Sequence, residues 1–344
     1  MLNYKVIVNF VLIHTYKSLN VMKHKLFNQI PSLDLADFRT GDTQQKKLFV
    51  EALGDAFTNI GFVAIKNHGL TDELTEKLYN VFERFFSLPD TIKQKYEISE
   101  LFGQRGYIGK AKEHAKGRNT GDLKEFYHIG QPAKDKDAGT EEYPENIWPE
   151  ELPEMQEIGV KVYQTLENTG KELLSAIALF LKLPHDYFDA KVHHGNSILR
   201  AIHYYPIENP DSVPEDAVRA AEHGDINLIT LLMGASAEGL QVLRRDGQWI
   251  PITALPNQIV VNVGDMLARL TNDTLKSTIH RVVNPPREKM GTSRYSIPFF
   301  MHPRSEMDLS CLKNCVSEDN PKKYTDMTAG EFLEERLAEI GFKK

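Results

Sequence analysis

The sequence contains only two cysteines, Cys311 and Cys315, among its 344 residues. Because no second cysteine pair is present, a four-thiolate zinc site is excluded, and so is a scaffold held together by several disulfides. We expect both residues to be reduced thiols in a cytoplasmic protein. A disulfide between them would instead indicate an oxidising compartment.

The sequence also lacks a long hydrophobic run. Its apolar N-terminal stretch, Val6 to Ile13, is interrupted by Asn9 and falls far short of the roughly 20 residues that a membrane-spanning helix requires. No small-x-small cleavage site accompanies the stretch. We therefore predict no membrane segment.

An excess of positive charge is the third absence. The 41 Lys and Arg residues are outnumbered by 48 Asp and Glu residues, which gives a net charge of −7 and a pI near 6.0. This balance argues against binding to nucleic acid or to an anionic membrane surface. A content of 41% hydrophobic and 26% charged residues is typical of a globular protein, so we expect a small molecule as the partner.

The second half of the chain carries a candidate metal site, made of His223, Asp225 and the distant His280. Side chains at positions i and i+2 of a strand share a face, so His223 and Asp225 would both reach one ion. Two imidazoles and one carboxylate are the donor set of non-haem Fe(II) oxygenases, which keep three further positions open. Zinc can bind the same donors, but the sequence offers no base beside them for zinc hydrolase chemistry.

Arg294 and Ser296 follow the second histidine and would share one face of a strand. A planar guanidinium and a hydroxyl could close together on a carboxylate, such as the far carboxylate of 2-oxoglutarate. The alternative for Arg294 is an ordinary charge on a surface strand.

Further short blocks occur in a fixed order along the chain. They are Ile30-Pro31-Ser32-Leu33-Asp34-Leu35, Gly61-Phe62 with Asn67-His68-Gly69, Gly239-Leu240-Gln241-Val242, Asn262-Val263-Gly264-Asp265 and Leu275-Lys276-Ser277-Thr278-Ile279-His280-Arg281-Val282. With these blocks, the chain from about Gln29 to the C-terminus resembles the isopenicillin-N-synthase-like branch of the Fe(II)/2-oxoglutarate oxygenases. The resemblance implies a dioxygenase that uses Fe(II), 2-oxoglutarate and O2, hydroxylates or desaturates a small metabolite, and releases succinate and CO2.

The same resemblance assigns roles to individual residues. It implies iron ligands at His223, Asp225 and His280, and a co-substrate clamp at Arg294 and Ser296. The Asn-x-Tyr element of the family, which also contacts 2-oxoglutarate, falls on His203-Tyr204-Tyr205. Tyr205 matches this element, whereas His203 replaces an amide by an imidazole of different hydrogen-bonding geometry. Hydrogen abstraction needs no general acid or base, so no catalytic residue is expected beyond the metal site, and His302 is kept only as a candidate pocket residue.

The substrate pocket is expected to involve the first half of the chain. By resemblance, Arg105, Tyr107, Phe126 and His128 are candidate substrate-binding residues; the alternative is a solvated loop charge and a packed aromatic cluster. The basic segment from Lys110 to Arg118 is a candidate lid. Two other functions stay open: a 2-oxoglutarate-independent Fe(II) oxidase or cyclase of the isopenicillin N synthase type, and a non-catalytic small-molecule binding protein of the same fold.

From Ile198 onward, short strands separated by Gly, Pro and Asn predict a double-stranded β-helix, the jelly-roll or cupin-like architecture. This α+β chain with a mostly β core would also carry an N-terminal helical region and a C-terminal helix. Helical spacing predicts helices over Thr43–Ile60, Thr71–Phe86, Met155–Leu181 and Thr328–Ile340. The predicted strands are Phe62–Ile65, Ile198–Tyr205, Gly239–Leu243, Trp249–Ile252, Gln258–Val263, Ser277–Val283 and Arg294–Met301.

We divide the chain into five segments. Residues 1–27 form an N-terminal extension, of which residues 1–21 are interpreted as an extension or a mis-set translation start because Met22 lies shortly before the first family-like block. The other segments are the N-terminal oxygenase region (28–150), connecting helices (151–196), the catalytic double-stranded β-helix (197–303) and a C-terminal helical tail (304–344).

Overall fold

The computed structural model describes residues 26–101, 103–109, 124–132, 143–207, 209, 218–233, 239–252 and 257–339. The predicted extension at residues 1–21 and the predicted lid from Lys110 to Arg118 lie outside these residues. Among the described residues, no helix is both long and apolar enough to cross a membrane. Cys311 and Cys315 are both free thiols.

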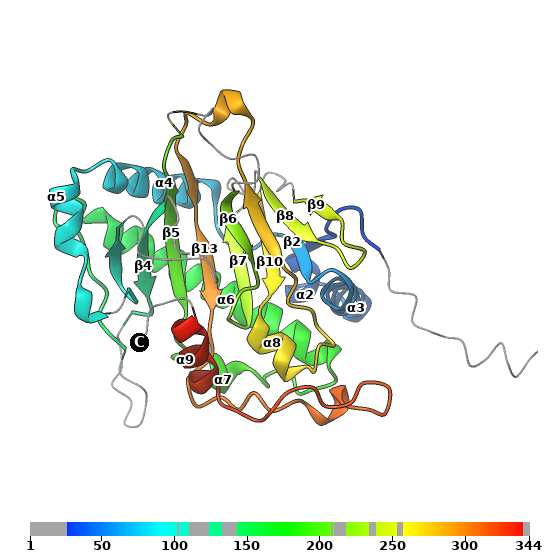
Figure 1. Ribbon diagram of the computed structural model, residues 1–344. Coiled ribbons are helices and arrows are strands. Elements are labelled where there is room, and N and C mark those ends of the chain that lie inside the picture. The colour runs from blue at the N-terminus through cyan, green and yellow to red at the C-terminus, as the bar shows by residue number, and fades with distance from the viewer. Residues whose placement is uncertain are drawn as a thin grey trace, which may run out of the picture.

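Two sheets form the centre of the molecule (Figure 1). The larger has nine strands, of which eight follow the order β1 (Ser32–Asp34), β2 (Phe62–Lys66), β10 (Gln258–Val263), β7 (Ile229–Met233), β13 (Pro298–Met301), β5 (Ile198–Tyr204), β4 (Lys124–Gly130) and β3 (Gly106–Ile108). The ninth, β12 (Arg294–Ser296), also pairs with β5. The smaller sheet has the order β6 (Val218–His223), β11 (His280–Val283), β8 (Leu240–Leu243) and β9 (Trp249–Pro251). This arrangement is the predicted double-stranded β-helix.

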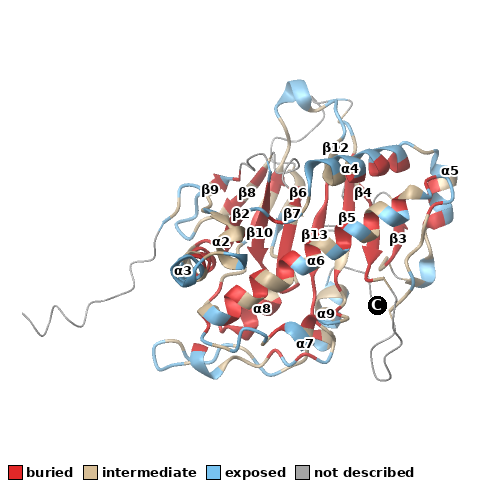
Figure 2. Ribbon diagram, turned by 180° about the vertical axis from the view of Figure 1, so that it is seen from behind, coloured by how far each residue is buried: buried red, intermediate tan, exposed pale blue. Residues whose placement is uncertain are grey.

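Three long helices cover the face of the large sheet that points away from the small one: α3 (Thr43–Asn59), α4 (Asp72–Phe86) and α6 (Glu154–Phe180). Figure 2 shows α6 lying across the strands, with buried residues toward the sheet and exposed residues outward. The packing is close, because a Cβ on Gly170 of α6 would lie 2.3 Å from the sulfur of Met301 on β13. A glycine therefore allows this helix to approach the sheet.

Local signals set where these helices begin. Asp42 and Gln45 form a reciprocal capping box at the start of α3, and the hydroxyl of Thr71 caps α4. The helices predicted at Thr43–Ile60, Thr71–Phe86 and Met155–Leu181 are confirmed to within a residue or so. The buried stripe of α3 runs through Phe49, Leu53 and Phe57, whereas Leu48 lies beside it and is 53% exposed.

The strand predictions were less complete. The strand expected at Ser277–Val283 begins only at His280, and the one expected at Arg294–Met301 is divided into β12 and β13 at Ile297. Five strands, β1, β3, β4, β6 and β7, were not predicted as strands. In β4 and β6, polar and charged residues hide the apolar alternation on which such predictions depend.

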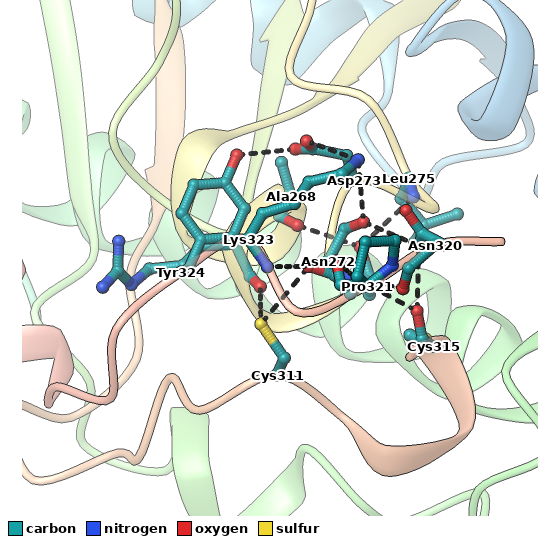
Figure 3. A network of polar contacts seen from close by, with 12 residues as sticks. Ala268, Asn272, Asp273, Leu275, Cys311, Cys315, Asn320, Pro321, Lys323 and Tyr324 are labelled. Carbon is teal, nitrogen blue, oxygen red and sulfur yellow. Dashed lines mark hydrogen bonds and ion pairs between the residues drawn. The ribbon is translucent and has the colours of Figure 1, made fainter. Parts of the chain in front are cut away.

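Short helices complete the described fold: α2 (Leu35–Arg39), α5 (Asp90–Lys93), α7 (Asp189–Val192), α8 (Asp265–Leu270) and α9 (Ala329–Glu339). The C-terminal tail is tied to the end of α8 by Asn272, which is fully buried with a positive φ of 48° (Figure 3). Its amide nitrogen donates to the carbonyls of Cys315, Asn320 and Pro321, and its oxygen accepts from the Lys323 N–H. The tail thereby fixes the helix that follows the candidate metal site.

Candidate iron and co-substrate site

The structure brings His223, Asp225 and His280 together, with their ligand atoms within 4.8 Å of one another. His223 ends β6, His280 begins β11, and the two residues are direct partners across these antiparallel strands. Asp225 lies just beyond the end of β6, so the expectation that both residues share one strand holds for His223 but not for Asp225. Its Oδ1 atom is 3.9 Å from Nε2 of His223 and 3.7 Å from Nε2 of His280.

Hydrogen bonds orient both imidazoles. The Nδ1 atom of His223 is 2.7 Å from the carbonyl oxygen of Ala221, and the Nδ1 atom of His280 is 3.2 Å from that of Thr278. A carbonyl can only accept, so each Nδ1 carries the proton and each Nε2 presents a lone pair. Although 47% of the His223 side chain is exposed, desolvation of its ring and the charge of the nearby His280 lower its pKa to about 4. The neutral form, which binds a metal, is therefore favoured.

The carboxylate is oriented in the same way. The Thr230 hydroxyl donates to Oδ2 of Asp225 at 2.6 Å, and the Asn262 amide donates to the same oxygen at 2.8 Å. Burial would raise the pKa of Asp225, but the two imidazoles and these two hydrogen bonds hold it below its usual value. The second oxygen, Oδ1, faces the two imidazoles.

Gly224 allows the two ligands of the His-Gly-Asp segment to approach the metal site. A Cβ at this position would lie 3.0 Å from Oδ1 of Asp265 and 3.1 Å from Oγ of Ser277. Ser277 and Asp265 are hydrogen-bonded to each other at 2.5 Å, and the Asp265 N–H donates to the carbonyl of Asp225. The space beside the ligands is therefore filled by their supporting groups.

The donor chemistry fits a non-haem iron ion. Two imidazole nitrogens and one carboxylate oxygen lie within 4.8 Å of one another, and this is the donor set of non-haem Fe(II) sites that keep further positions open to co-substrate and dioxygen. Each ligand is held by an outer hydrogen bond of the kind that fixes metal ligands. The three residues would hold the iron through Nε2 of each histidine and Oδ1 of the aspartate.

Strand alternation identifies the inner face of the large sheet. Thr230 contacts Asp225 and is the register partner of Phe300 on β13, so the side chain of Phe300 points to the same inner face. Ser296 and Arg294 continue this alternation, whereas Ile297 and Phe299 join the core under the helices. The predicted clamp residues therefore lie on the face of the large sheet that points toward the candidate iron ligands.

Within this face, Arg294 pairs with Tyr204 across β12 and β5, and its guanidinium carbon is 5.1 Å from the centre of the Tyr204 ring. Ser296 is buried beside Arg294 and is the register partner of Ile202. The guanidinium is thus held against an aromatic face, in a position fixed by the strand pairing.

The structure does not place His203 and Tyr205 with this clamp. His203 alternates with Tyr204, so it points to the opposite face of β5, where its ring stacks on Tyr295 at 4.9 Å. Its Nδ1 atom is 2.7 Å from Oε1 of Glu125, and its Nε2 atom is 2.9 Å from Oγ of Ser293. Tyr205 lies beside His203, with ring centres 5.0 Å apart. The expected contacts of these two residues with 2-oxoglutarate are therefore corrected.

His203 belongs instead to a buried ionic cluster behind the clamp. Glu125 is fully buried and accepts from Lys93 at 2.8 Å and from the Tyr107 hydroxyl at 2.6 Å. Although burial would raise the pKa of Glu125, hydrogen bonds from His203, Lys93 and Tyr107 lower it to about 2. Tyr107, a predicted substrate residue, is therefore a structural partner of this cluster.

The other three predicted substrate residues lie on the inner side of β4. Phe126 and His128 share the inner face, and the guanidinium of Arg105 occupies the space where a Cβ of Gly130 would lie on that face. Arg105 is 1% exposed, and its Nε and Nη2 atoms have no hydrogen-bond partner among the described residues.

Two further residues join Arg105, Phe126 and His128 in lining the inner face, and we call these five residues the wall. Arg200 was not predicted from the sequence, and His302 was named only as a candidate pocket residue. Arg200 of β5 donates through Nε to Nε2 of His128 at 2.6 Å, and its guanidinium carbon is 4.4 Å from the centre of the Phe126 ring. His302, just beyond β13, is buried, its Nδ1 atom has no hydrogen-bond partner among the described residues, and burial lowers its pKa to about 4. No local motif marks Arg200; only the register of β5 against β4 reveals it.

Comparisons with known proteins show which family this chain is similar to. A model described as the N-terminal region of a non-haem dioxygenase in morphine synthesis matches residues 30–151, and a model of the 2OG-Fe(II) oxygenase superfamily matches residues 195–303. A 2-oxoglutarate-Fe(II) type oxidoreductase of Metarhizium rileyi is 32% identical, with 90% of each chain covered. A 2-oxoglutarate-dependent dioxygenase of Aspergillus rugulosus is 33% identical over 87% of this chain and 95% of its own.

Solved structures similar to this chain also include a 2OG-Fe(II) oxygenase family protein and a protein that carries alpha-KG. A 2OG-Fe(II) oxygenase family protein of Caulobacter crescentus is 42% identical, with a TM-score of 0.80, covering 90% of this chain and 99% of its own. A full-length protein of Neurospora crassa, crystallised in complex with alpha-KG and thymine, is 32% identical with a TM-score of 0.79, covering 90% of this chain and 96% of its own.

Proposed function

We propose which residues carry the activity of this chain, which belongs to the 2OG-Fe(II) oxygenase superfamily. The iron is bound by His223, Asp225 and His280. The 2-oxoglutarate is bound by Arg294 and Ser296. The enzyme is a Fe(II)- and 2-oxoglutarate-dependent dioxygenase. The residue assignment is supported by where the two groups lie. His223 and His280 are paired at the ends of two strands of the small sheet, and the clamp residues lie on the inner side of the large sheet.

When bound, iron and 2-oxoglutarate supply the oxidising chemistry, with release of succinate and CO2. The protein holds the two imidazoles in the metal-binding tautomer and directs Oδ1 of Asp225 toward them. Arg294 and Ser296 would fix the far carboxylate of the co-substrate, so that its other end is oriented toward the iron ligands. The ring of Phe62 contacts His280 edge-on and helps to keep this imidazole buried.

We further infer that the substrate binds against the wall formed by Arg105, Phe126, His128, Arg200 and His302. Arg105 and His302 carry buried nitrogen atoms without hydrogen-bond partners among the described residues, and Arg200 is oriented by His128 and Phe126. Such a wall favours a small molecule that combines a flat apolar part with carbonyl or carboxylate oxygens. The complex of the Neurospora crassa protein with thymine shows that a related chain binds a molecule of this kind.

A cytoplasmic location also stays a proposal. The two free cysteines support it, because reduced thiols persist in a reducing compartment.

The test of the main assignment is an anaerobic titration of the Fe(II)-loaded protein with 2-oxoglutarate, followed by the visible charge-transfer band of the chelated keto acid. We expect a saturable band in the wild type and no iron binding in Asp225→Ala. Arg294→Ala should keep its iron but need at least about tenfold more 2-oxoglutarate, because a charge-assisted contact is lost.

Arg84→Ala is the matched control, since Arg84 pairs with Glu154 on the surface with 60% of its side chain exposed. We expect this variant to bind 2-oxoglutarate with the same affinity as the wild type in the anaerobic titration. Unchanged affinity in Arg294→Ala would show that the clamp assignment is wrong. Bound iron without any band would favour the 2-oxoglutarate-independent oxidase.

A further inference from the structure

A second arginine, Arg219 of β6, lies beside the predicted clamp. Its guanidinium carbon is 5.9 Å from the centre of the Tyr204 ring, the same ring that lies 5.1 Å from the guanidinium carbon of Arg294. Arg219 belongs to the small sheet and Arg294 to the large one. The two cations therefore approach one aromatic ring from strands of opposite sheets.

The position of Arg219 is fixed by its surroundings. Its Nη2 atom donates to the carbonyl oxygen of Thr292 at 3.3 Å, just before the strand that carries Arg294. Its Nε atom is buried and has no hydrogen-bond partner among the described residues. The pKa of Arg219 is lowered mainly by burial of its guanidinium group and to a lesser extent by the positive charge of Arg294.

This arrangement is unfavourable for the protein alone. A buried N–H without a partner costs free energy, and a second positive charge nearby adds repulsion. Both costs are removed when an anion accepts from the two guanidinium groups. A carboxylate offers two oxygens with several lone pairs, which is enough for Arg294, Ser296 and one further donor.

We propose that Arg219 is a second cationic contact for the far carboxylate of 2-oxoglutarate. This inference rests on the proposed co-substrate site and adds a residue that the Arg-x-Ser motif does not contain. Arg219 closes the site from the small sheet, so the co-substrate carboxylate links the two sheets at this edge. A dicarboxylate is therefore preferred over a 2-oxo acid that lacks the second carboxylate.

The experiment compares two keto acids of equal chain length in the anaerobic titration. 2-Oxoglutarate has the far carboxylate, whereas 2-oxopentanoate ends in a methyl group. We expect Arg219→Gln to raise the Kd of 2-oxoglutarate by about tenfold, as expected for one lost charged hydrogen bond, and to leave the Kd of 2-oxopentanoate unchanged. Arg219→Lys should lie between the wild type and Arg219→Gln, since it keeps the charge but loses the planar fork.

The two keto acids separate binding from structure. If Arg219 only ties β6 to Thr292, its replacement weakens both keto acids alike or neither, and either result overturns the inference. The proposed function is judged separately by Arg294→Ala. A large effect of Arg294→Ala with no effect of Arg219→Gln would reject the role of Arg219 but keep the co-substrate site. No charge-transfer band in the wild type would reject the co-substrate site itself. Arg84→Gln is the surface control.

Discussion

The hydroxyl of Thr230 donates to Oδ2 of Asp225 at 2.6 Å, which links the centre of the large sheet to the ligand set of the small one. Asn262, on the strand next to Thr230, donates to the same oxygen. The two residues hold one carboxylate oxygen so that the other faces the imidazoles. The candidate metal site therefore depends on the packing of one sheet against the other.

Thr230→Val should weaken iron binding without unfolding the protein. Valine keeps the shape of threonine but removes the hydrogen bond, and loss of such an outer contact typically costs about 10- to 100-fold in metal affinity. Anaerobic Fe(II) titration measures the effect, and Thr230→Ser, which retains the hydroxyl, is the control. Equal affinities in Thr230→Val and the wild type would mean that Asn262 alone orients Asp225.

Gly224→Ala tests the space between the ligands. The added Cβ would be 3.0 Å from Oδ1 of Asp265, so either this supporting carboxylate or the His-Gly-Asp segment must shift. We expect iron affinity to fall by about tenfold. Gly291→Ala is the control because a Cβ there meets no atom within 4 Å. Wild-type affinity in Gly224→Ala would show that the neighbours yield without disturbing the ligands.

The buried cluster around Glu125 should make stability depend on pH. The pKa of Glu125 is about 2 in the folded protein and near 4.5 when the side chain is unperturbed. Between these values the unfolded chain binds the additional proton, so the stabilisation is fully present above pH 4.5 and is lost as the pH falls toward 2. The full contribution is about 3 kcal/mol.

Urea unfolding of the wild type and Glu125→Gln over this pH range measures the contribution. Other carboxylates titrate in both proteins, so the difference in slope is the informative quantity. The variant should be less stable at neutral pH, because Lys93 loses its buried partner, and its stability should fall less steeply with acid. Parallel slopes would contradict the role of Glu125.

Asn272→Ala should destabilise the protein through the C-terminal tail. Alanine loses the hydrogen bonds that join α8 to Cys315, Asn320 and Pro321, and it adopts the positive φ of this position less readily. We expect a loss of about 3 kcal/mol in the free energy of unfolding. Asn272→Gly relieves the backbone strain but not the lost bonds, so a variant as stable as wild type would assign the whole effect to the backbone.

Some of the fold and site follows from the sequence alone. The helix boundaries follow because capping residues such as Asp42 and Thr71 act within one turn of the chain. The candidate iron ligands His223 and Asp225 and the candidate clamp residues Arg294 and Ser296 could be proposed because their residue types and close spacing suit metal and carboxylate binding. His280, far along the chain, was added by its residue type and by the family resemblance.

Only the tertiary structure decides which face each strand residue presents. A shift of one residue reverses the face, and the register of β5 against β12 turns His203 toward Glu125 and Tyr204 toward Arg294. The same long-range pairing brings Thr230 to Asp225 and Arg219 to the Tyr204 ring. Such contacts join segments far apart in the chain, and no local pattern encodes them, because they result from how the two sheets pack.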